Sequence, residues 1–222
     1  MIPILSFIGW HNSGKTTIAS RVVRHLTEAG YSVGVIKSSK ESGIAADQPG
    51  TDTHGYARAG AAQVMLVTPD QLLLRSPSPT QDLLQLVALH FSTMDLVLVE
   101  GFKHHPALAK IEVHRRGTDF LHLQVEQVVA LVAAEAVPGL PWFSPEQSLE
   151  LARYIITTFL SHPAIPEIHS RLLVNGRERE LPAWAEQSIL RTLHSVAGSI
   201  TRDRAGAEKT LDFSLVSTLP AP

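Results

Sequence analysis

Residues 4–17 read ILSFIGWHNSGKTT, and this stretch dictates the kind of fold that the chain adopts. Its first five residues form a short apolar run that predicts a buried strand. The residues that follow match G-x-x-x-x-G-K-[ST], the phosphate-binding loop, whose backbone N–H groups surround a phosphate. Gly9 and Gly14 are the glycines of this motif, since the tight loop needs backbone angles that other residues resist. The stretch predicts a site for a nucleoside triphosphate or a ligand built like one.

Each part of the loop has an expected role. The Lys15 ammonium would contact the β- and γ-phosphates, and the Thr16 hydroxyl would hold a Mg²⁺ ion. His11 is expected to shape the rim of the site. The loop residues predicted to contact the nucleotide are Gly9, His11, Asn12, Ser13, Gly14, Lys15, Thr16 and Thr17.

The sequence after the loop provides the context that the motif requires. A helix is predicted because apolar residues recur on one face until Gly30 ends the pattern, at Ile18, Val22, Leu26 and Ala29. Residues 32–37 then predict a second strand, buried and β-branched. Strand, helix and strand at this spacing form a βαβ unit, whose strands should be parallel and whose crossover should be right-handed.

Composition limits the possible classes of protein. The chain has 222 residues, of which 44% are hydrophobic and 18% are charged, so it can form a real core. The net charge of −2 gives no basic field for nucleic acid or an anionic membrane. Cysteine is absent, which excludes disulfides, thiolate catalysis and Cys-ligated metal sites. No apolar run reaches the length of a membrane span, and the start does not resemble a signal peptide, so we expect the cytoplasm.

The remaining pattern predicts an α/β domain of the P-loop type over residues 1–161, with a mostly parallel sheet flanked by helices. Further strands are expected at 62–67, 71–74, 95–100, 110–114 and 128–133, of which 110–114 alternates. A short helix should begin near Thr51. Two more should begin at the N-caps Ser78 and Ser144, with inward faces formed by Leu83, Leu84, Val87 and Phe91 and by Leu149, Ala152, Ile156 and Phe159.

A second, smaller part is predicted over residues 163–222. Pro163 and Pro166 mark the boundary. Asn175-Gly176 between two short strands predicts a β-hairpin, followed by an amphipathic helix through residues 189–200 and a last strand at 211–216. We expect this small C-terminal hairpin-plus-helix extension to serve docking or dimer formation.

Several charged residues are candidates for work beside the phosphates. Glu100 ends an apolar strand, where a P-loop protein needs a carboxylate for Mg²⁺; the alternative is an ordinary strand-end charge facing solvent. Asp52 and Asp47 lie in a polar loop that should overhang the site, and either would join the Mg²⁺ shell or remain a solvated charge. Lys37 could meet a phosphate or a ligand carboxylate. The Gly101 N–H could approach a γ-phosphate; the alternative is a plain turn glycine.

Positive character follows Glu100 on the same loop. Lys103, His104 and His105 are expected to be solvated loop residues, because adjacent histidines do not share a face and form a weak metal pair. Asp95, at the opposite end of the strand, is expected to be a structural cap.

Three segments together resemble the molybdopterin-guanine dinucleotide biosynthesis protein B (MobB) family. They are GWHNSGKTT (9–17), DQPGTDTHGYARAGA (47–61) and DLVLVEGFKHHPALAKIEVHR (95–115). The resemblance covers roughly residues 1–160, and VEGFK followed by KIEVHR is its most specific part.

The resemblance implies a P-loop GTP-binding accessory protein that is usually dimeric, with weak GTPase activity and GTP and Mg²⁺ as ligands. It would assist a guanylyltransferase that attaches GMP to molybdopterin, so its implied partners are that enzyme, the molybdopterin cofactor or a molybdoenzyme apoprotein. Lys15, Asp52 and Glu100 would be its catalytic residues, and Thr16, Asp52 and Glu100 would hold the metal.

The chain departs from the family pattern in places. Ser38-Ser39-Lys40 replaces a His-rich stretch, and Ala133-Ala134-Glu135 stands where a V-x-T-D-like strand end would meet the base. No N-K-x-D guanine signature is present. Two other functions therefore stay open. One is a P-loop kinase or ligase that transfers a phosphoryl group from ATP, with Asp52 as its base. The other is a degenerate nucleotide binder kept as a structural subunit.

Overall fold

A computed structural model provides the fold, and the residues it describes are 2–39, 41, 48–77, 82–160, 172–174, 177–180 and 189. The chain divides into two compact units: Pro3–His162 forms one, and Pro163–Pro222 with Met1–Ile2 forms the other. Each unit is described by itself. The assignment of domains to 1–161 and 163–222 stays a prediction. None of the helices in the described part of the chain is long and apolar enough to cross a membrane.

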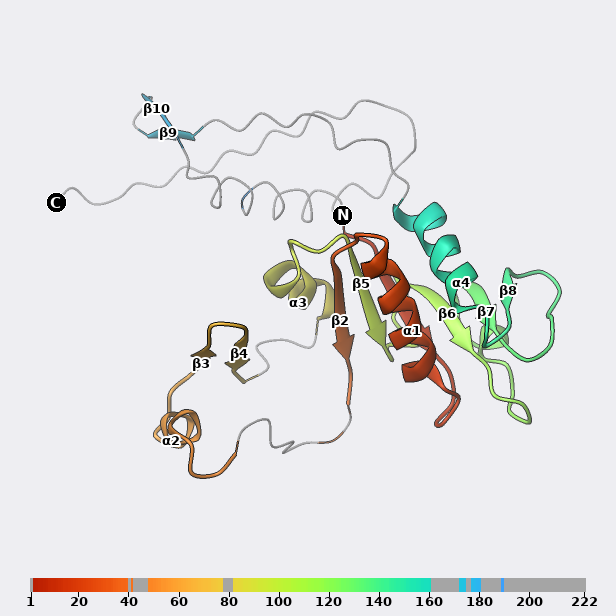
Figure 1. The fold of residues 1–222 in the computed structure, drawn as a ribbon, viewed down its shortest axis with the longest axis horizontal. Coiled ribbons are helices and arrows are strands. Elements are labelled where there is room, and N and C mark those ends of the chain that lie inside the picture. The colour runs from red at the N-terminus through yellow and green to blue at the C-terminus, as the bar shows by residue number, and fades with distance from the viewer. Residues whose placement is uncertain are drawn as a thin grey trace. The chain divides into compact units, whose positions relative to one another are not determined.

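A six-stranded sheet forms the centre of the larger unit (Figure 1). Its order is β2-β5-β1-β6-β7-β8, and every neighbouring pair is parallel. The strands are β1 (Ile4–Ile8), β2 (Val33–Lys37), β5 (Leu96–Glu100), β6 (Ala109–Val113), β7 (Val128–Val132) and β8 (Trp142–Phe143). The predicted α/β class with a mostly parallel sheet is confirmed.

Helices α1 (Lys15–Glu28) and α4 (Ser148–Ile155) lie side by side over one face of this sheet (Figure 1). The α1 face is the predicted one, since Ile18, Val22 and Leu26 are buried, while Ala29 caps the helix. These side chains join alternate residues of four strands in one apolar core, for example Leu5 and Phe7 of β1. The buried residues of α1, four positions apart, therefore pack on every second residue of the strands, over one face of the sheet.

The other face of the sheet contains buried polar side chains. Ser6, Lys110 and Glu112 are each at most 1% exposed. All three bond to the backbone of irregular segments that follow β5 and β6, as with Ser6 Oγ, which donates to the Gly101 carbonyl. Buried polar groups need such partners, so these residues hold loops against the sheet.

Two strand expectations need correction. β2 is an edge strand, because β5 lies between β1 and β2, and Val35 is 51% exposed. A β-branched run could not reveal that position. β6 was expected to alternate between a buried and an exposed face, but both faces are covered, including Lys110 and Glu112. The two-residue strand β8 was not predicted.

Two helix starts also differ from expectation. Helix α3 (Leu83–His90) is capped by Asp82, whose carboxylate accepts from the Leu84 N–H at 2.9 Å. The helix therefore begins later than the predicted N-cap Ser78, which itself lies outside the described residues. Helix α4 is capped by Gln147, not Ser144. Gln147 Oε1 accepts from the Ser144 N–H at 2.8 Å, but this bond closes a turn before the helix.

The faces of these two helices differ from expectation to unequal degrees. Leu83 and Val87 of α3 are buried as predicted. Of the predicted α4 face, Ala152 is buried and Ile156 and Phe159 pack partly buried against the core, but Leu149 is 41% exposed. The other buried residues of α4 are Ser148, Leu151 and Ile155. A short 3-10 turn, η1 (Leu121–Leu123), and the π-helical continuation of α4, η2 (Ile156–Leu160), were not predicted.

Smaller elements complete the picture. Helix α2 (Asp52–Arg58) and the antiparallel pair β3 (Val64–Val67) and β4 (Leu72–Arg75) form as expected from the sequence. The structure adds that α2 contacts β3. In the smaller unit, β9 (Leu172–Val174) and β10 (Arg177–Arg179) form the predicted antiparallel hairpin. The helix expected at 189–200, apart from residue 189, and the strand expected at 211–216 lie outside the described residues.

Candidate functional site

The phosphate loop joins the end of β1 to the start of α1, which is the context the motif requires. Gly14 caps the helix with φ 88°, a left-handed angle that favours glycine. At Gly9 the constraint is space, because a Cβ there would lie 2.4 Å from the Val113 carbonyl oxygen and 2.5 Å from Ser13 Oγ. Gly14 is thus favoured by its backbone angle, and Gly9 by the close approach of Val113 and Ser13.

The start of α1 suits an anion. Its first turn contains no acidic residue, and no side chain caps its N–H groups. Free N–H groups and the positive end of the helix dipole favour a phosphate at such a position. His11, Asn12 and Thr17 are exposed around the loop, and Asn12 has a left-handed φ of 58°.

Lys15 lies folded along the loop. Its Nζ donates to the carbonyls of Trp10 at 2.7 Å and Gly9 at 3.1 Å. Burial lowers the pKa of Lys15 from its ordinary value; the Glu100 carboxylate raises it in part, and Lys37 lowers it further. Lys15 is half-buried, and a phosphate oxygen would be a favourable partner for its ammonium.

Glu100 lies beside the loop, at the end of β5 next to β1. Thr16 Oγ1 donates to both of its carboxylate oxygens, at 2.8 and 3.0 Å. Lys37 Nζ, at the end of the neighbouring strand β2, lies 3.8 Å from Glu100 Oε1. The parallel sheet thus brings together the ends of three strands, with one hydroxyl, one carboxylate and two ammonium groups.

These oxygens fit a Mg²⁺ ion. The cation prefers oxygen ligands and usually keeps waters and phosphate oxygens in its shell. Among the described residues, no group of three or more His, Cys, Asp or Glu side chains could hold a metal ion without other ligands. Thr16 and Glu100 therefore suit an ion that arrives with a nucleotide.

The other predicted site residues differ in whether they lie near the phosphate loop. Gly101, with φ 110°, continues from Glu100, and its N–H donates to the Phe7 carbonyl at 3.2 Å. Asp52 is exposed at the start of α2, and no hydrogen bond or ion pair within the described part of the chain joins it to Thr16 or Glu100. Its role stays a prediction. Asp47 lies outside the described residues. Asp95 is the structural cap expected, since its Oδ2 accepts from the Ser32 N–H at 2.8 Å.

Two kinds of residue escaped the sequence analysis. Trp10, inside the motif, provides one of the carbonyls that hold Lys15; its place directly after Gly9 was the available signal. Lys110 and Glu112 are buried, and nothing in an alternating strand pattern distinguishes a buried charge from a solvated one.

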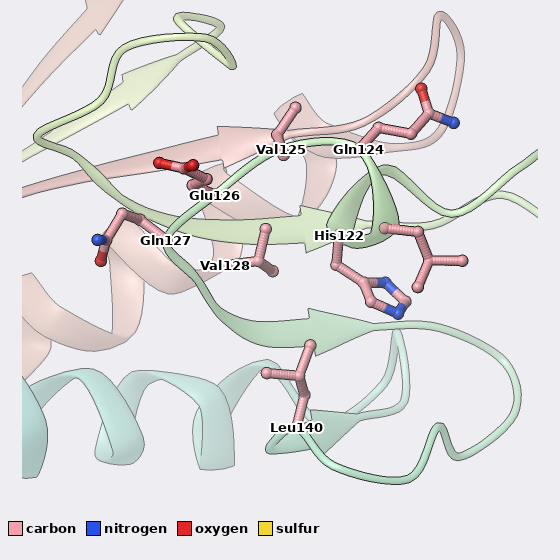
Figure 2. A pocket seen from close by; sticks show the side chains of 8 residues that line it. His122, Gln124, Val125, Glu126, Gln127, Val128 and Leu140 are labelled. Atoms are coloured by element: carbon pink, nitrogen blue, oxygen red, sulfur yellow. The ribbon is translucent and has the colours of Figure 1, made fainter.

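The described residues also form a hollow of about 610 Å³ (Figure 2). It lies between the segment that leads into β7 and Leu140, with the His122 ring at one end (Figure 2). None of the predicted nucleotide contacts lines it. Its lining residues are His122, Leu123, Gln124, Val125, Glu126, Gln127, Val128 and Leu140.

Comparison with known proteins agrees with this geometry. Residues 4–134, more than half of the chain, match the family model of molybdopterin guanine dinucleotide synthesis protein B (MobB). The chain belongs to this family. The MobB resemblance seen in the sequence is therefore confirmed.

Curated relatives of the MobB family are similar over most of the larger unit. The molybdopterin-guanine dinucleotide biosynthesis adapter protein of Escherichia coli is 34% identical over 141 residues, which are 61% of this chain and 79% of the relative. The protein of the same name from Haemophilus influenzae is 33% identical over 134 residues, 60% of this chain and 74% of the relative. The expectation of an adapter is confirmed at the level of the family.

Solved structures of MobB proteins share the fold. A crystal structure of molybdopterin-guanine biosynthesis protein B superposes with a TM-score of 0.60 at 28% identity, covering 71% of this chain and 99% of the other. Bacillus subtilis MobB has a TM-score of 0.59 at 25% identity and covers 72% and 99%. The solved proteins are thus matched almost completely, and the part of this chain beyond them is extra.

Proposed function

We propose that this chain is a GTP-binding adapter of molybdenum cofactor biosynthesis. It would assist the guanylyltransferase that converts molybdopterin to its guanine dinucleotide form, in the cytoplasm, with weak GTPase activity of its own. The partner would be that enzyme, with the cofactor or a molybdoenzyme apoprotein as the recipient. Membership of the MobB family and the names of its curated relatives support the adapter role.

One observation carries the nucleotide part of the proposal. Thr16 Oγ1 donates to the Glu100 carboxylate, although 84 residues separate them in the chain. A phosphate loop without such a carboxylate would bind phosphate, whereas Thr16 and Glu100 together would supply oxygen ligands for a Mg²⁺ ion. When bound, that ion would neutralise charge on the β- and γ-phosphates.

The chain's own residues would then do the following. Backbone N–H groups of the loop and of the first turn of α1 bind the phosphates, and Lys15 exchanges its carbonyl partners for phosphate oxygens. Lys37 would approach the terminal phosphate, and the Gly101 N–H would do so only by leaving the Phe7 carbonyl to which it donates. Asp52 would reach this site only if α2 lies over it; its catalytic and metal roles remain proposals.

A homodimer is also part of the proposal. The β3–β4 hairpin is apolar and exposed on both faces, with Met65 53%, Val67 67%, Leu72 56% and Leu73 53% exposed. An isolated two-stranded hairpin is marginally stable in water, and an exposed apolar surface of this kind marks an interface. A second copy of the chain is the occupant that the MobB resemblance implies.

Calorimetric titration with GTP and, separately, ATP, each with Mg²⁺, tests the nucleotide proposal. We expect selective GTP binding by the wild type and none by Lys15→Ala, with negligible turnover until the partner enzyme is added. Preference for ATP and steady phosphoryl transfer to an added acceptor would instead establish the kinase reading. Binding of neither nucleotide would overturn both functions.

A further inference from the structure

Trp10 is fixed between two loops that come from distant parts of the chain. Its indole Nε1–H donates to the Asp119 carbonyl at 2.7 Å. The Lys103 ammonium lies 5.1 Å from the ring centroid, within the range of a cation–π contact. The residue is 36% exposed. Because the side chain is only partly buried, the hydrophobic effect alone does not explain why it makes these two contacts.

The loop that contains Lys103 is held by a buried cation. Lys110 on β6 is 1% exposed. Its Nζ donates to the carbonyls of His105 at 2.8 Å, Leu108 at 2.9 Å and Glu126 at 3.0 Å. An ammonium has three donors, and this one uses all of them on backbone oxygens. Lys110 therefore fixes the segment that carries Lys103.

The loop that contains Asp119 is held by a buried anion two residues further along β6. Glu112 is 0% exposed. Its carboxylate accepts from the Leu121 N–H at 2.7 Å, the His122 N–H at 2.8 Å and His122 Nδ1 at 3.0 Å. The Phe120 ring, beside Asp119, stacks on His114 at 3.8 Å between centroids. This second loop is thus also anchored to the sheet.

Trp10 transmits this restraint to the phosphate loop. Its carbonyl accepts from Lys15 Nζ at 2.7 Å and from the Ser13 N–H at 3.2 Å. The peptide that positions the phosphate-binding lysine therefore belongs to the residue whose side chain the two loops hold. The two segments of the family resemblance other than 47–61, residues 9–17 and 95–115, thus meet where Lys103 contacts the Trp10 ring.

We propose that Trp10 is a positioning residue for the nucleotide. Its indole keeps the phosphate loop in the shape that binds phosphates, and bound nucleotide in turn restrains the segment around Asp119, since such coupling is reciprocal. The inference rests on the proposed nucleotide function. It assigns no chemistry to Trp10 and acts through Lys15 and the loop backbone.

Substitutions at Trp10 test the proposal against a matched tryptophan. Trp142 Nε1 also donates to a backbone carbonyl, that of Ala133 at 3.0 Å, but on β8. We expect Trp10→Leu to weaken Mg²⁺·GTP binding about tenfold, mainly through faster dissociation. Trp10→Phe, which keeps a ring beside Lys103 but loses the N–H, should weaken it about threefold. Trp142→Phe should leave the affinity unchanged, and the melting temperatures should show that all variants fold.

A spectroscopic measurement separates positioning from general packing. With Trp142→Phe and Trp184→Phe, Trp10 is the one tryptophan left of three. Its emission should change on adding GTP, and inorganic tripolyphosphate should produce the same change, since the phosphate chain is what the loop binds. Both responses should be lost in Lys15→Ala.

The outcomes distinguish this inference from the proposed function. The positioning role is overturned if the wild type and Trp10→Leu bind GTP with equal affinity. It is also overturned if the Trp10 emission does not change when ligand binds. Either result leaves the GTP proposal standing. ATP preference with the same loss in Trp10→Leu overturns GTP specificity and supports the positioning role. Binding of neither nucleotide nor tripolyphosphate overturns both.

Discussion

Glu100 is the residue on which metal-dependent binding should depend. Its carboxylate accepts from Thr16 Oγ1 at 2.8 and 3.0 Å and lies next to Lys37. We expect Glu100→Gln to weaken nucleotide binding in Mg²⁺ about tenfold or more, because a neutral amide is a poor ligand for this cation. In EDTA the affinity should not fall, since a negative charge near the phosphates has been removed. Titration with and without Mg²⁺ measures both effects.

The matched control for this prediction lies at the other end of the same strand. Asp95→Asn also removes one carboxylate, one that bonds the Ser32 N–H. Its Mg²⁺-dependent affinity should equal that of the wild type. An equal loss in both variants would show that Glu100 acts through net charge and not as a ligand.

Lys15 should lose its proton at a lower pH than an ordinary lysine side chain. Burial is the main reason that its pKa is lowered. Below that lowered pKa the ammonium is charged and nucleotide binding is at full strength; binding weakens as pH rises through it. Bound phosphate should raise the pKa again, because it favours the charged form. A ¹³C NMR titration of the lysine side chains, assigned with Lys15→Ala, checks the direction, which a late Lys15 transition would contradict.

At the scale of the element, strand β6 anchors the neighbouring loops to the sheet. It carries both buried charges, which hold the loops on the polar face. Lys110→Met would leave three carbonyls without their donor. We expect it to lower the free energy of unfolding by about 3 kcal/mol, a typical effect for buried bonds to a charged group.

Urea unfolding provides the measurement, with Lys37→Met as the control, because the Lys37 side chain is 63% exposed. The control should change stability by less than about 0.5 kcal/mol. A similar small effect at Lys110 would mean that the loops hold their shape without it.

At the scale of the whole molecule, the β3–β4 hairpin should join two copies. Leu66 and Leu73 are paired across the hairpin. We expect the double substitution Leu66→Glu and Leu73→Lys to convert a dimer to a monomer, while the opposite charges keep the strands paired. Sedimentation velocity measures the mass. Leu123→Glu, at a position 77% exposed outside the hairpin, should leave the dimer intact. An unchanged mass in the double variant would place the interface elsewhere.

The larger unit should also function without the extension. Pro3–His162 has its own core and contains the phosphate loop together with the described residues that bond to it. We expect a chain that ends at residue 162 to fold and to bind Mg²⁺·GTP within about threefold of the full chain. Loss of cooperative unfolding in the shortened chain would show that residues 163–222 complete the core.

The sequence alone determined the parts of this protein that depend on neighbours along the chain. Glycines at two positions, a lysine and a threonine specify the phosphate loop, because its backbone angles and ligands come from nine consecutive residues. The apolar run before Glu100 was enough to place a carboxylate at the end of a strand. Parallel strands end at one edge, so the sequence placed Glu100 and the phosphate loop at the same edge of the sheet; the strand order, with β5 next to β1, then brings Glu100 to Thr16.

Only the tertiary structure decided what depends on strand order and on loops. The sequence could not show that β5 lies between β1 and β2 and leaves Val35 exposed. It could not show that Lys110 and Glu112 face a polar interior, since their surroundings come from segments that have no regular period. Trp10 meets a carbonyl 109 residues away. Contacts of this kind join residues that are distant in the sequence, so a local sequence pattern cannot predict them.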